Sequence, residues 1–203
     1  MKHSHILLAG GKSSRFGQPK AFKNWNGILL YEWCKQALGG EQTYIVSHPS
    51  LVARFQERME ENIIVDLEPF SGKGPLAGIY TAMNLIESDY YTFLPCDTPL
   101  VEQRTIELLK REARGFDAVV PIADGRIHPL VSVIHHQAKD VVYKQLLGNQ
   151  LRAVDLFQLL HTNYLEVECF GSKSWEFINV NVEEDLKELN KHVVQRFNLN
   201  DEE

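Results

Sequence analysis

Short apolar segments alternate with longer segments of helical periodicity along the first 120 residues of the chain. The strand-like segments are 6–8, 43–46, 63–65, 90–94 and 118–120. The helical segments are about 28–38, 50–60, 75–87 and 102–114. Strands and helices in this order predict βαβ units, in which a mostly parallel sheet carries helices on both faces.

Glycine, proline and asparagine mark the expected ends of several helices. Gly74-Pro75 places proline at a first helical position, and Gly39 follows the last apolar residue of an earlier helix. Asn181 is placed to cap a helix beginning at residue 182, with Glu184 in the position of a capping box. These signals agree with the helix positions that the periodicity predicts.

The second half of the chain has a less regular pattern. Asp124-Gly125 is a turn signal that predicts a hairpin between 118–123 and 129–134. Two further helices and one strand are expected at about 137–147, 152–161 and 163–169. Because the sequence shows neither an internal repeat nor a linker, we expect one α/β domain over residues 1–203. Its expected fold is a three-layer, Rossmann-like arrangement with a mostly parallel sheet.

Composition and charge exclude several classes of protein. The 203 residues are 44% hydrophobic and 24% charged, with 21 basic and 27 acidic side chains, which gives a net charge of −6. This balance argues against a disordered chain and against general affinity for nucleic acids or anionic membranes. No stretch approaches the roughly 20 apolar residues of a membrane span, and the apolar run after the N-terminus is too short for a signal peptide.

The three cysteines also limit the possibilities. Cys34, Cys96 and Cys169 lie far apart and form no C-x-x-C pair, which disfavours a disulfide framework or a structural zinc site. Together with the lack of a targeting segment, this predicts a cytoplasmic protein. Any anionic ligand of so acidic a chain must be held by a local basic cluster.

Such a cluster follows the first predicted strand. The segment reads Leu8-Ala9-Gly10-Gly11-Lys12-Ser13-Ser14-Arg15-Phe16-Gly17-Gln18-Pro19-Lys20. Its glycines allow backbone N–H groups to approach phosphate oxygens, and Lys12, Arg15 and Lys20 supply the charge that a triphosphate requires. A P-loop is excluded because position 6 is Ile6 rather than glycine, and G-x-G-x-x-G does not fit either. The alternative is a solvated loop that is basic by chance.

Two aspartates follow later strands of the predicted sheet. Asp97 lies between two prolines in Leu94-Pro95-Cys96-Asp97-Thr98-Pro99, directly after the strongest strand signal. A carboxylate at the end of a strand, close to a polyphosphate loop, is the type of ligand that Mg²⁺ takes. The alternative is a turn aspartate that accepts local backbone hydrogen bonds. Asp66 ends the preceding strand, and Gly74 and Gly78 then permit close approach at a helix N-terminus, where an anion is favoured.

The segment from Leu8 to Lys20 resembles the signature of nucleotidyltransferases with a glycosyltransferase-A-like fold, the nucleotide-diphospho-sugar transferase type. Within that group it is most similar to the molybdenum cofactor guanylyltransferases, which transfer GMP from GTP to molybdenum-bound molybdopterin and release pyrophosphate. Phe16 replaces the methionine common in the signature. The resemblance recurs at Leu94–Pro99 and at Gly74–Gly78, and it covers most of the chain.

The resemblance implies a set of site residues. Arg15, Lys20 and Asp97 would be catalytic, Asp97 would hold Mg²⁺, and GTP would be bound by these residues: Leu8, Ala9, Gly10, Gly11, Lys20, Asp66 and Asp97. Residues 1–100 would form the nucleotide-binding half and 101–203 the acceptor-binding half. His128–Val131 and Phe177–Asn181 would line the pterin side, where Asn179 and Asn181 project to one side of an extended stretch. The alternative for His128 is a purely structural role, and the alternative for Asn181 is capping of the following helix.

Three other functions remain open at this point. One is a cytidylyltransferase for the same pterin, which Gly11 disfavours because the family's L-A-G-G motif accompanies guanine and L-A-A-G accompanies cytosine. Another is a sugar-phosphate nucleotidyltransferase. The third is a non-catalytic nucleotide-binding regulator, which would be expected to lack the metal carboxylate. Expected partners are GTP, molybdenum-molybdopterin and, transiently, proteins that deliver or receive the cofactor, with the chain a monomer or weak oligomer.

Overall fold

A computed structural model describes residues 1–11, 18–39 and 42–199, with backbone alone for 193–199. Its main feature is an eight-stranded sheet in which β10, β7, β9, β6, β1, β4 and β5 lie side by side and β8 pairs with β7. Strand β1 (His3–Ala9) is central and runs parallel to both β4 (Thr43–Ser47) and β6 (Tyr90–Pro95). The predicted mostly parallel sheet is therefore confirmed.

The remaining strands extend the sheet on either side. Strand β5 (Ile63–Val65) continues it in parallel beyond β4. On the other side, β9 (Ser132–His135) is antiparallel to β6 and to β7 (Ala118–Ala123), while β10 (Thr162–Glu166) is parallel to β7. The sheet is mixed because the chain enters β9 from a hairpin rather than from a helical crossover.

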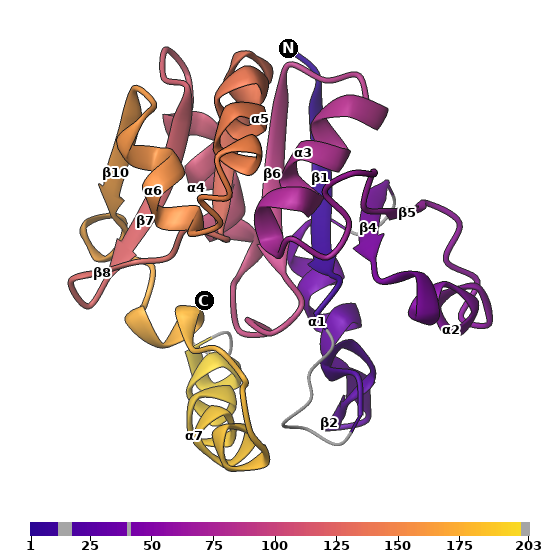
Figure 1. Cartoon of the computed structure of the whole chain (residues 1–203). Helices are drawn as coiled ribbons and strands as arrows, with labels where there is room; N and C mark the ends of the chain where they lie inside the picture. The colour runs from indigo at the N-terminus through magenta and orange to yellow at the C-terminus, as the bar shows by residue number, and fades with distance from the viewer. Residues whose placement is uncertain (12–17, 40–41, 200–203) are drawn as a thin grey trace.

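Two hydrophobic clusters, one on each face of the sheet, hold the helices in place. The alternation of side chains along β1 sends Leu7 into one cluster and Ile6 into the other, and both are fully buried. The first face is covered by α1 (Leu30–Ala37), α2 (Val52–Gln56) and α4 (Gln103–Glu112). The second is covered by α3 (Pro75–Leu85), α5 (Lys139–Leu147) and α6 (Ala153–Gln158). The result is the expected three-layer α/β domain (Figure 1).

A third, smaller cluster lies beyond the carboxyl end of β1. It joins the hairpin of β2 (Asn24–Trp25) and β3 (Ile28–Leu29) to α7 (Glu183–Leu199) through Trp25, Leu30, Leu100, Val180 and Leu189. The indole N–H of Trp25 also donates to Asn190 Oδ1 at 2.9 Å. Figure 1 shows the hairpin and α7 projecting below the sheet, at the end where the central parallel strands finish.

Most expected elements are confirmed, and the differences have local causes. The turn at Asp124-Gly125 has positive φ at both residues and leads into β8 (Arg126–Ile127), after which β9 returns along β7. The strand expected over 163–169 ends at Glu166, because the chain then coils into the 3₁₀-helix η5 (Val167–Phe170) and turns at Gly171, where φ is 89°.

Helix α7 begins one residue later than expected, and its N-terminus is capped by a different side chain. Asp185 Oδ2 accepts hydrogen bonds from the backbone N–H groups of Asn181 at 2.5 Å and Val182 at 2.9 Å. The prediction that Asn181 and Glu184 form a capping box is therefore wrong, because Asp185 accepts from these backbone groups and the Asn181 side chain is engaged elsewhere. Within the described part of the chain, no helix has both the length and the apolar composition needed to cross a membrane.

Candidate active site

The carboxyl ends of four parallel strands meet at one edge of the sheet. Gly10 follows β1, His48 follows β4, Asp66 follows β5, and Asp97 lies two residues after the end of β6. The backbone N–H of Cys96 donates to Leu8 O at 3.1 Å and fixes the loop after β6 against β1. This is the edge at which open α/β sheets bind ligands.

A cleft of about 650 Å³ opens at this edge, and we call it the first cleft. Its size is within the usual range for a small-molecule site. The residues that line it come from the ends of β1, β4, β5 and β6, from the 3₁₀-helix η2 (Lys20–Phe22) and from the start of α3. They include Leu8, Gly10, Gly11, Lys20, His48, Asp66, Gly72, Gly74, Gly78 and Asp97.

Gly78 allows α3 to lie close to the sheet beneath the first cleft. A Cβ atom at this position would stand 3.1 Å from Leu8 Cδ2 and 3.1 Å from Val46 Cγ1. The preceding Gly74 has φ of 74° and directs the chain into the helix, whose first residue is Pro75. The N-terminus of α3, with its exposed N–H groups and positive dipole end, therefore faces into the cleft.

Asp66 follows β5, which β1 and β4 separate from the strand before Asp97, and it is partly buried. Its Oδ2 accepts a hydrogen bond of 3.3 Å from the backbone N–H of Gly72. Burial raises the pKa of this carboxyl, and the Gly72 hydrogen bond partly offsets the rise. The carboxylate thus orders the loop before α3 while remaining in the lining of the cleft.

Lys20 links two residues that are distant in the sequence. Its Nζ donates to Asp97 Oδ2 at 2.9 Å and to Asn181 Oδ1 at 3.0 Å. The Lys20 and Asp97 side chains are 15% and 23% exposed, so their ion pair is partly shielded from water. Oδ1 of Asp97 accepts no hydrogen bond from the described residues, which leaves an oxygen for a hard cation.

A second cleft, of about 800 Å³, lies on the other side of Asp97. It is lined by the β7–β8 turn, by the segment 128–131 and by the chain between the 3₁₀-helix η6 (Ser174–Phe177) and α7. Asn179 and Asn181 are exposed and line this cleft, whereas Val180 between them is fully buried. The expected alternation of the two amides is therefore confirmed.

Asp97 and its neighbour Pro95 line both clefts, and so does Leu130. The backbone also joins the two sides, because Val180 N donates to Asp97 O at 2.8 Å. Two ligands, one in each cleft, would meet at Asp97 and Lys20. The arrangement suits a transfer of a charged group from one ligand to the other.

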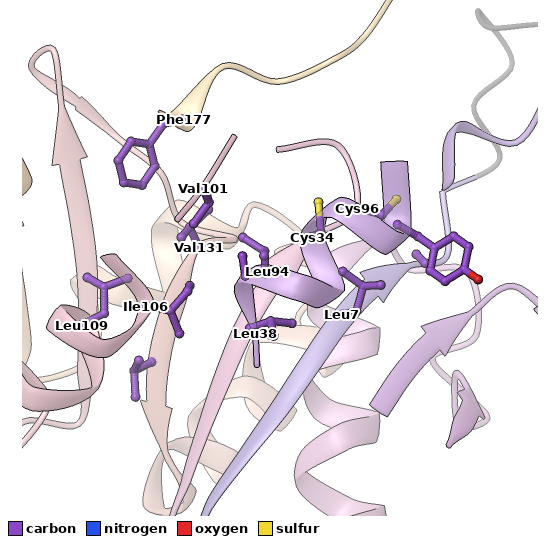
Figure 2. Close-up of a cluster of buried hydrophobic side chains, with 14 of the residues drawn as sticks. Leu7, Cys34, Leu38, Leu94, Cys96, Val101, Ile106, Leu109, Val131 and Phe177 are labelled. Atoms are coloured by element: carbon purple, nitrogen blue, oxygen red, sulfur yellow. The ribbon is translucent and has the colours of Figure 1, made fainter. Parts of the chain in front are cut away.

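The cysteines nearest the site are not suited to nucleophilic catalysis. Cys34 and Cys96 are buried in the hydrophobic cluster of the first face (Figure 2). Burial raises the pKa of Cys96 to about 12 and that of Cys34 well above its usual range, so both are thiols at neutral pH. A direct transfer between two bound ligands requires no such nucleophile.

The structure brings together every expected site residue that it describes. Lys20, Asp66 and Asp97 line the first cleft with Leu8, Gly10 and Gly11, whereas Ala9, between Leu8 and Gly10, is buried in the cluster of the first face. Asn179 and Asn181 line the second cleft. Arg15 and the neighbouring residues Lys12–Gly17 lie outside the described residues, so their expected roles stay predictions.

Several lining residues were not singled out from the sequence. Arg126 enters the second cleft from the β7–β8 turn, and Trp175 enters it from η6 and stacks on His192 with ring centroids 5.5 Å apart. The turn signal Asp124-Gly125 could have indicated Arg126 as the next exposed side chain. The contact between Trp175 and His192 joins residues 17 positions apart by tertiary packing, for which the sequence holds no local signal.

Comparison with known families and structures identifies the group to which these features belong. Residues 5–161 match the family described as the MobA-like NTP transferase domain. The chain belongs to this family. Its nucleotidyltransferase class agrees with the two adjoining clefts and with the basic loop after β1.

Relatives of this MobA-like chain share nearly its whole length. A Bacillus licheniformis protein named "probable molybdenum cofactor guanylyltransferase" is 50% identical over 93% of this chain and 97% of its own. A Bacillus subtilis protein of the same name is 50% identical over 92% and 94%. The solved structure of molybdopterin-guanine dinucleotide biosynthesis protein A from Archaeoglobus fulgidus superposes with a TM-score of 0.81, at 25% identity, over 95% of this chain and 99% of that one.

Proposed function

We propose that this MobA-like chain transfers GMP from GTP to molybdenum-bound molybdopterin, forming the guanine dinucleotide cofactor and pyrophosphate. The observation that carries the proposal is the meeting of two clefts at Asp97 and Lys20. The half-identical relatives bear the name of this activity over nearly their whole length.

The first cleft is assigned to GTP. Leu8, Ala9, Gly10 and Gly11 bring the backbone at the end of β1 to the nucleotide, and the N-terminus of α3 faces it from below. Asp66 supplies a carboxylate acceptor on the same wall, suited to the N–H donors of guanine or to a ribose hydroxyl. Lys20 and Arg15 are assigned to the triphosphate, whose negative charge they would neutralise.

Nucleotidyltransferases of this family generally use a divalent metal. No group of three histidine, cysteine or acidic side chains suited to a metal occurs among the described residues. Mg²⁺ needs no such group, because it commonly takes one or two carboxylates and completes its shell with phosphates and water. We assign it to Asp97, where it would withdraw charge from the triphosphate and from the departing pyrophosphate.

The transfer itself is an in-line substitution at the α-phosphorus of GTP. A terminal phosphate oxygen of the pterin forms the new P–O bond, and the bond between the α-phosphorus and the bridging oxygen breaks, so that pyrophosphate leaves with the bonding electron pair. Lys20, with Nζ already held at the junction of the clefts, stabilises the charge that develops on the transferred group. The protein thus acts by positioning and by charge neutralisation.

The second cleft is assigned to the pterin. Asn179 and Asn181 present amides that can hydrogen-bond its ring or its phosphate, and residues 101–203 supply most of the cleft. We include transient partners that deliver molybdopterin or receive the finished cofactor. The first 100 residues then form the nucleotide-binding half and the remainder the acceptor-binding half.

The proposal is tested by measuring pyrophosphate release from GTP, CTP and ATP, each with and without molybdenum-molybdopterin. We expect release that requires the acceptor and Mg²⁺ and that strongly favours GTP, because a site built to hydrogen-bond one base leaves buried groups unpaired with another. Equal or preferred use of CTP would instead indicate the cytidylyltransferase. Release that depends on a sugar phosphate would indicate the other nucleotidyltransferase class, and tight GTP binding without release would indicate a regulator.

A further inference from the structure

Glu176 is the one carboxylate whose side chain is completely buried among the described side chains, with 0% exposure. Burying a charged group is costly unless it is hydrogen-bonded on all sides, so charged residues are rarely enclosed in this way. Glu176 lies in η6, between Trp175 and Phe177, which both line the second cleft. Its own side chain does not line the cleft.

The Glu176 carboxylate is bound by groups from two distant parts of the chain. Oε2 accepts from the Thr105 hydroxyl at 2.6 Å and from the Glu102 backbone N–H at 3.3 Å. Oε1 accepts from the Lys173 backbone N–H at 2.8 Å and lies 3.6 Å from Arg104 Nη2. Both oxygens are therefore occupied, and residues 102–105 at the start of α4 are joined to η6.

The hydroxyl groups beside Glu176 have little access to water. Thr105 and Ser172 are both buried, and their hydroxyl oxygens are 2.7 Å apart. Because the single hydroxyl proton of Thr105 goes to Glu176, Ser172 donates in turn to Thr105. Glu176 is thus the terminal acceptor of a short buried chain of hydrogen bonds, and a neutral replacement would leave donors unpaired.

The segment that Glu176 holds is also fixed at a second point. Val180 is fully buried in the small cluster beside α7, and its N–H donates to Asp97 O at 2.8 Å. Phe177 is buried between these two points and belongs to the same core cluster as Val101 and Val131 (Figure 2). Asn179 therefore lies on a short span attached at Glu176 to α4 and at Val180 to the loop of Asp97.

We propose that Glu176 is a positioning residue for the pterin acceptor: through α4 it fixes the segment 173–181 that forms a wall of the second cleft. The inference rests on the proposed function, since it assigns the second cleft to the acceptor. Glu176 does not line the first cleft, so its effect should be larger on the acceptor than on GTP. Burial also raises the pKa of Glu176, although its hydrogen bonds from Thr105 and Lys173 oppose the rise.

The test compares Glu176→Gln and Thr105→Val with the matched control Glu107→Gln. Glu107 is an exposed carboxylate on α4, the helix that carries Thr105, and it is paired with Lys110. For each protein we would measure KM for molybdenum-molybdopterin, KM for GTP, and hydrogen exchange of peptides covering 172–181. We expect both test variants to raise the acceptor KM at least tenfold, to change the GTP KM less than twofold, and to accelerate exchange in 172–181. The control should match the wild type.

The outcomes distinguish failure of the Glu176 positioning role from failure of the proposed GMP transfer. If the wild type transfers GMP but the variants keep the wild-type acceptor KM, or change both KM values equally, the positioning role is refuted. If the wild type transfers no GMP to the pterin, the proposed function fails, and the assigned role of Glu176 fails with it. If Glu176→Gln does not fold, Thr105→Val tests the positioning role, because it removes one hydroxyl while Glu176 keeps its backbone donors. Thr105→Ser, which retains the hydroxyl, should have the acceptor KM of the wild type.

Discussion

Replacing Asp97 with asparagine separates a catalytic role for this residue from a merely structural one. The substitution removes the negative charge but preserves the shape of the side chain and one oxygen acceptor for Lys20. The loop should keep its form, since the N–H of Val180 bonds to the backbone carbonyl of residue 97 rather than to its side chain. Only the charge-assisted part of the Lys20 hydrogen bond is lost.

The size of each effect follows from the geometry. The Lys20–Asp97 bond is 2.9 Å long with both side chains mostly buried, and weakening it should cost about 1 kcal/mol of the free energy of unfolding. For a chain of this length that lowers Tm by roughly 2–4 °C. Loss of a preorganised charge at the reacting phosphate costs about 3–4 kcal/mol, or a roughly 10²–10³-fold slower transfer.

The assay is GMP transfer across a Mg²⁺ titration, with thermal unfolding of the same samples. We expect a folded Asp97→Asn protein whose residual activity requires more Mg²⁺ than the wild type. Asp140→Asn, an exposed carboxylate at the start of α5, is the control and should behave as the wild type. A marked fall in Tm with unchanged activity per folded molecule and unchanged Mg²⁺ dependence would show that Asp97 is only a turn residue.

Three other perturbations probe the site and its support. Lys20→Ala should slow transfer by the equivalent of about 2–4 kcal/mol. It should also lower Tm by at least as much as Asp97→Asn, because it removes the whole ion pair with Asp97 and the hydrogen bond to Asn181. Lys144→Ala on α5 should change neither quantity, and equal transfer rates for Lys20→Ala and the wild type would remove Lys20 from the phosphate site. Gly78→Val should lower the free energy of unfolding by about 1–3 kcal/mol in urea titrations and weaken GTP binding, because side chains of β1 and β4 already lie 3.1 Å from its Cβ position. Burial lowers the pKa of His3 and His5, so the neutral imidazoles stabilise the folded protein above pH 6.5. This stabilisation is lost as the pH falls from 6.5 towards the pKa values of the folded state. Replacing both residues with glutamine should therefore reduce the change in the free energy of unfolding, measured by urea titration, between pH 7 and pH 5.

The parts of the fold that could be predicted from the sequence are those encoded locally. Strand β6 is an unbroken apolar run and α3 has proline at its start, so their type and position follow from short-range rules. Because parallel strands end at the same edge of the sheet, Asp66 and Asp97 could be placed near the glycines that follow the first strand. The relation to a family then supplied the expected roles.

Tertiary contacts account for what the sequence did not predict. The Asn181 side chain has the capping propensity that suggested a helix start, yet Lys20, 161 residues away, donates to it, and Asp185 binds the nearby backbone. Glu176 has no sequence signal of burial, because its Oε2 accepts from residues about 70 positions earlier. The Glu176 contacts depend on the approach of α4 to η6, and the Lys20–Asn181 contact depends on the approach of η2 to the segment before α7; local patterns encode neither.

The distribution of lining residues along the chain has a consequence for how this enzyme class can diversify. Among the described residues, all that line the first cleft except Leu130 lie at or before Asp97, whereas the second cleft takes nearly all of its lining from Ala123 onward. Leu130 and Asn181 aside, substitutions, insertions or exchanged segments after residue 120 can therefore change the contacts of a ligand in the second cleft while a ligand in the first cleft keeps its own. Selection for a new acceptor would act on a continuous stretch of the gene, and a recombination point between β6 and β7 would exchange one specificity without disturbing the other.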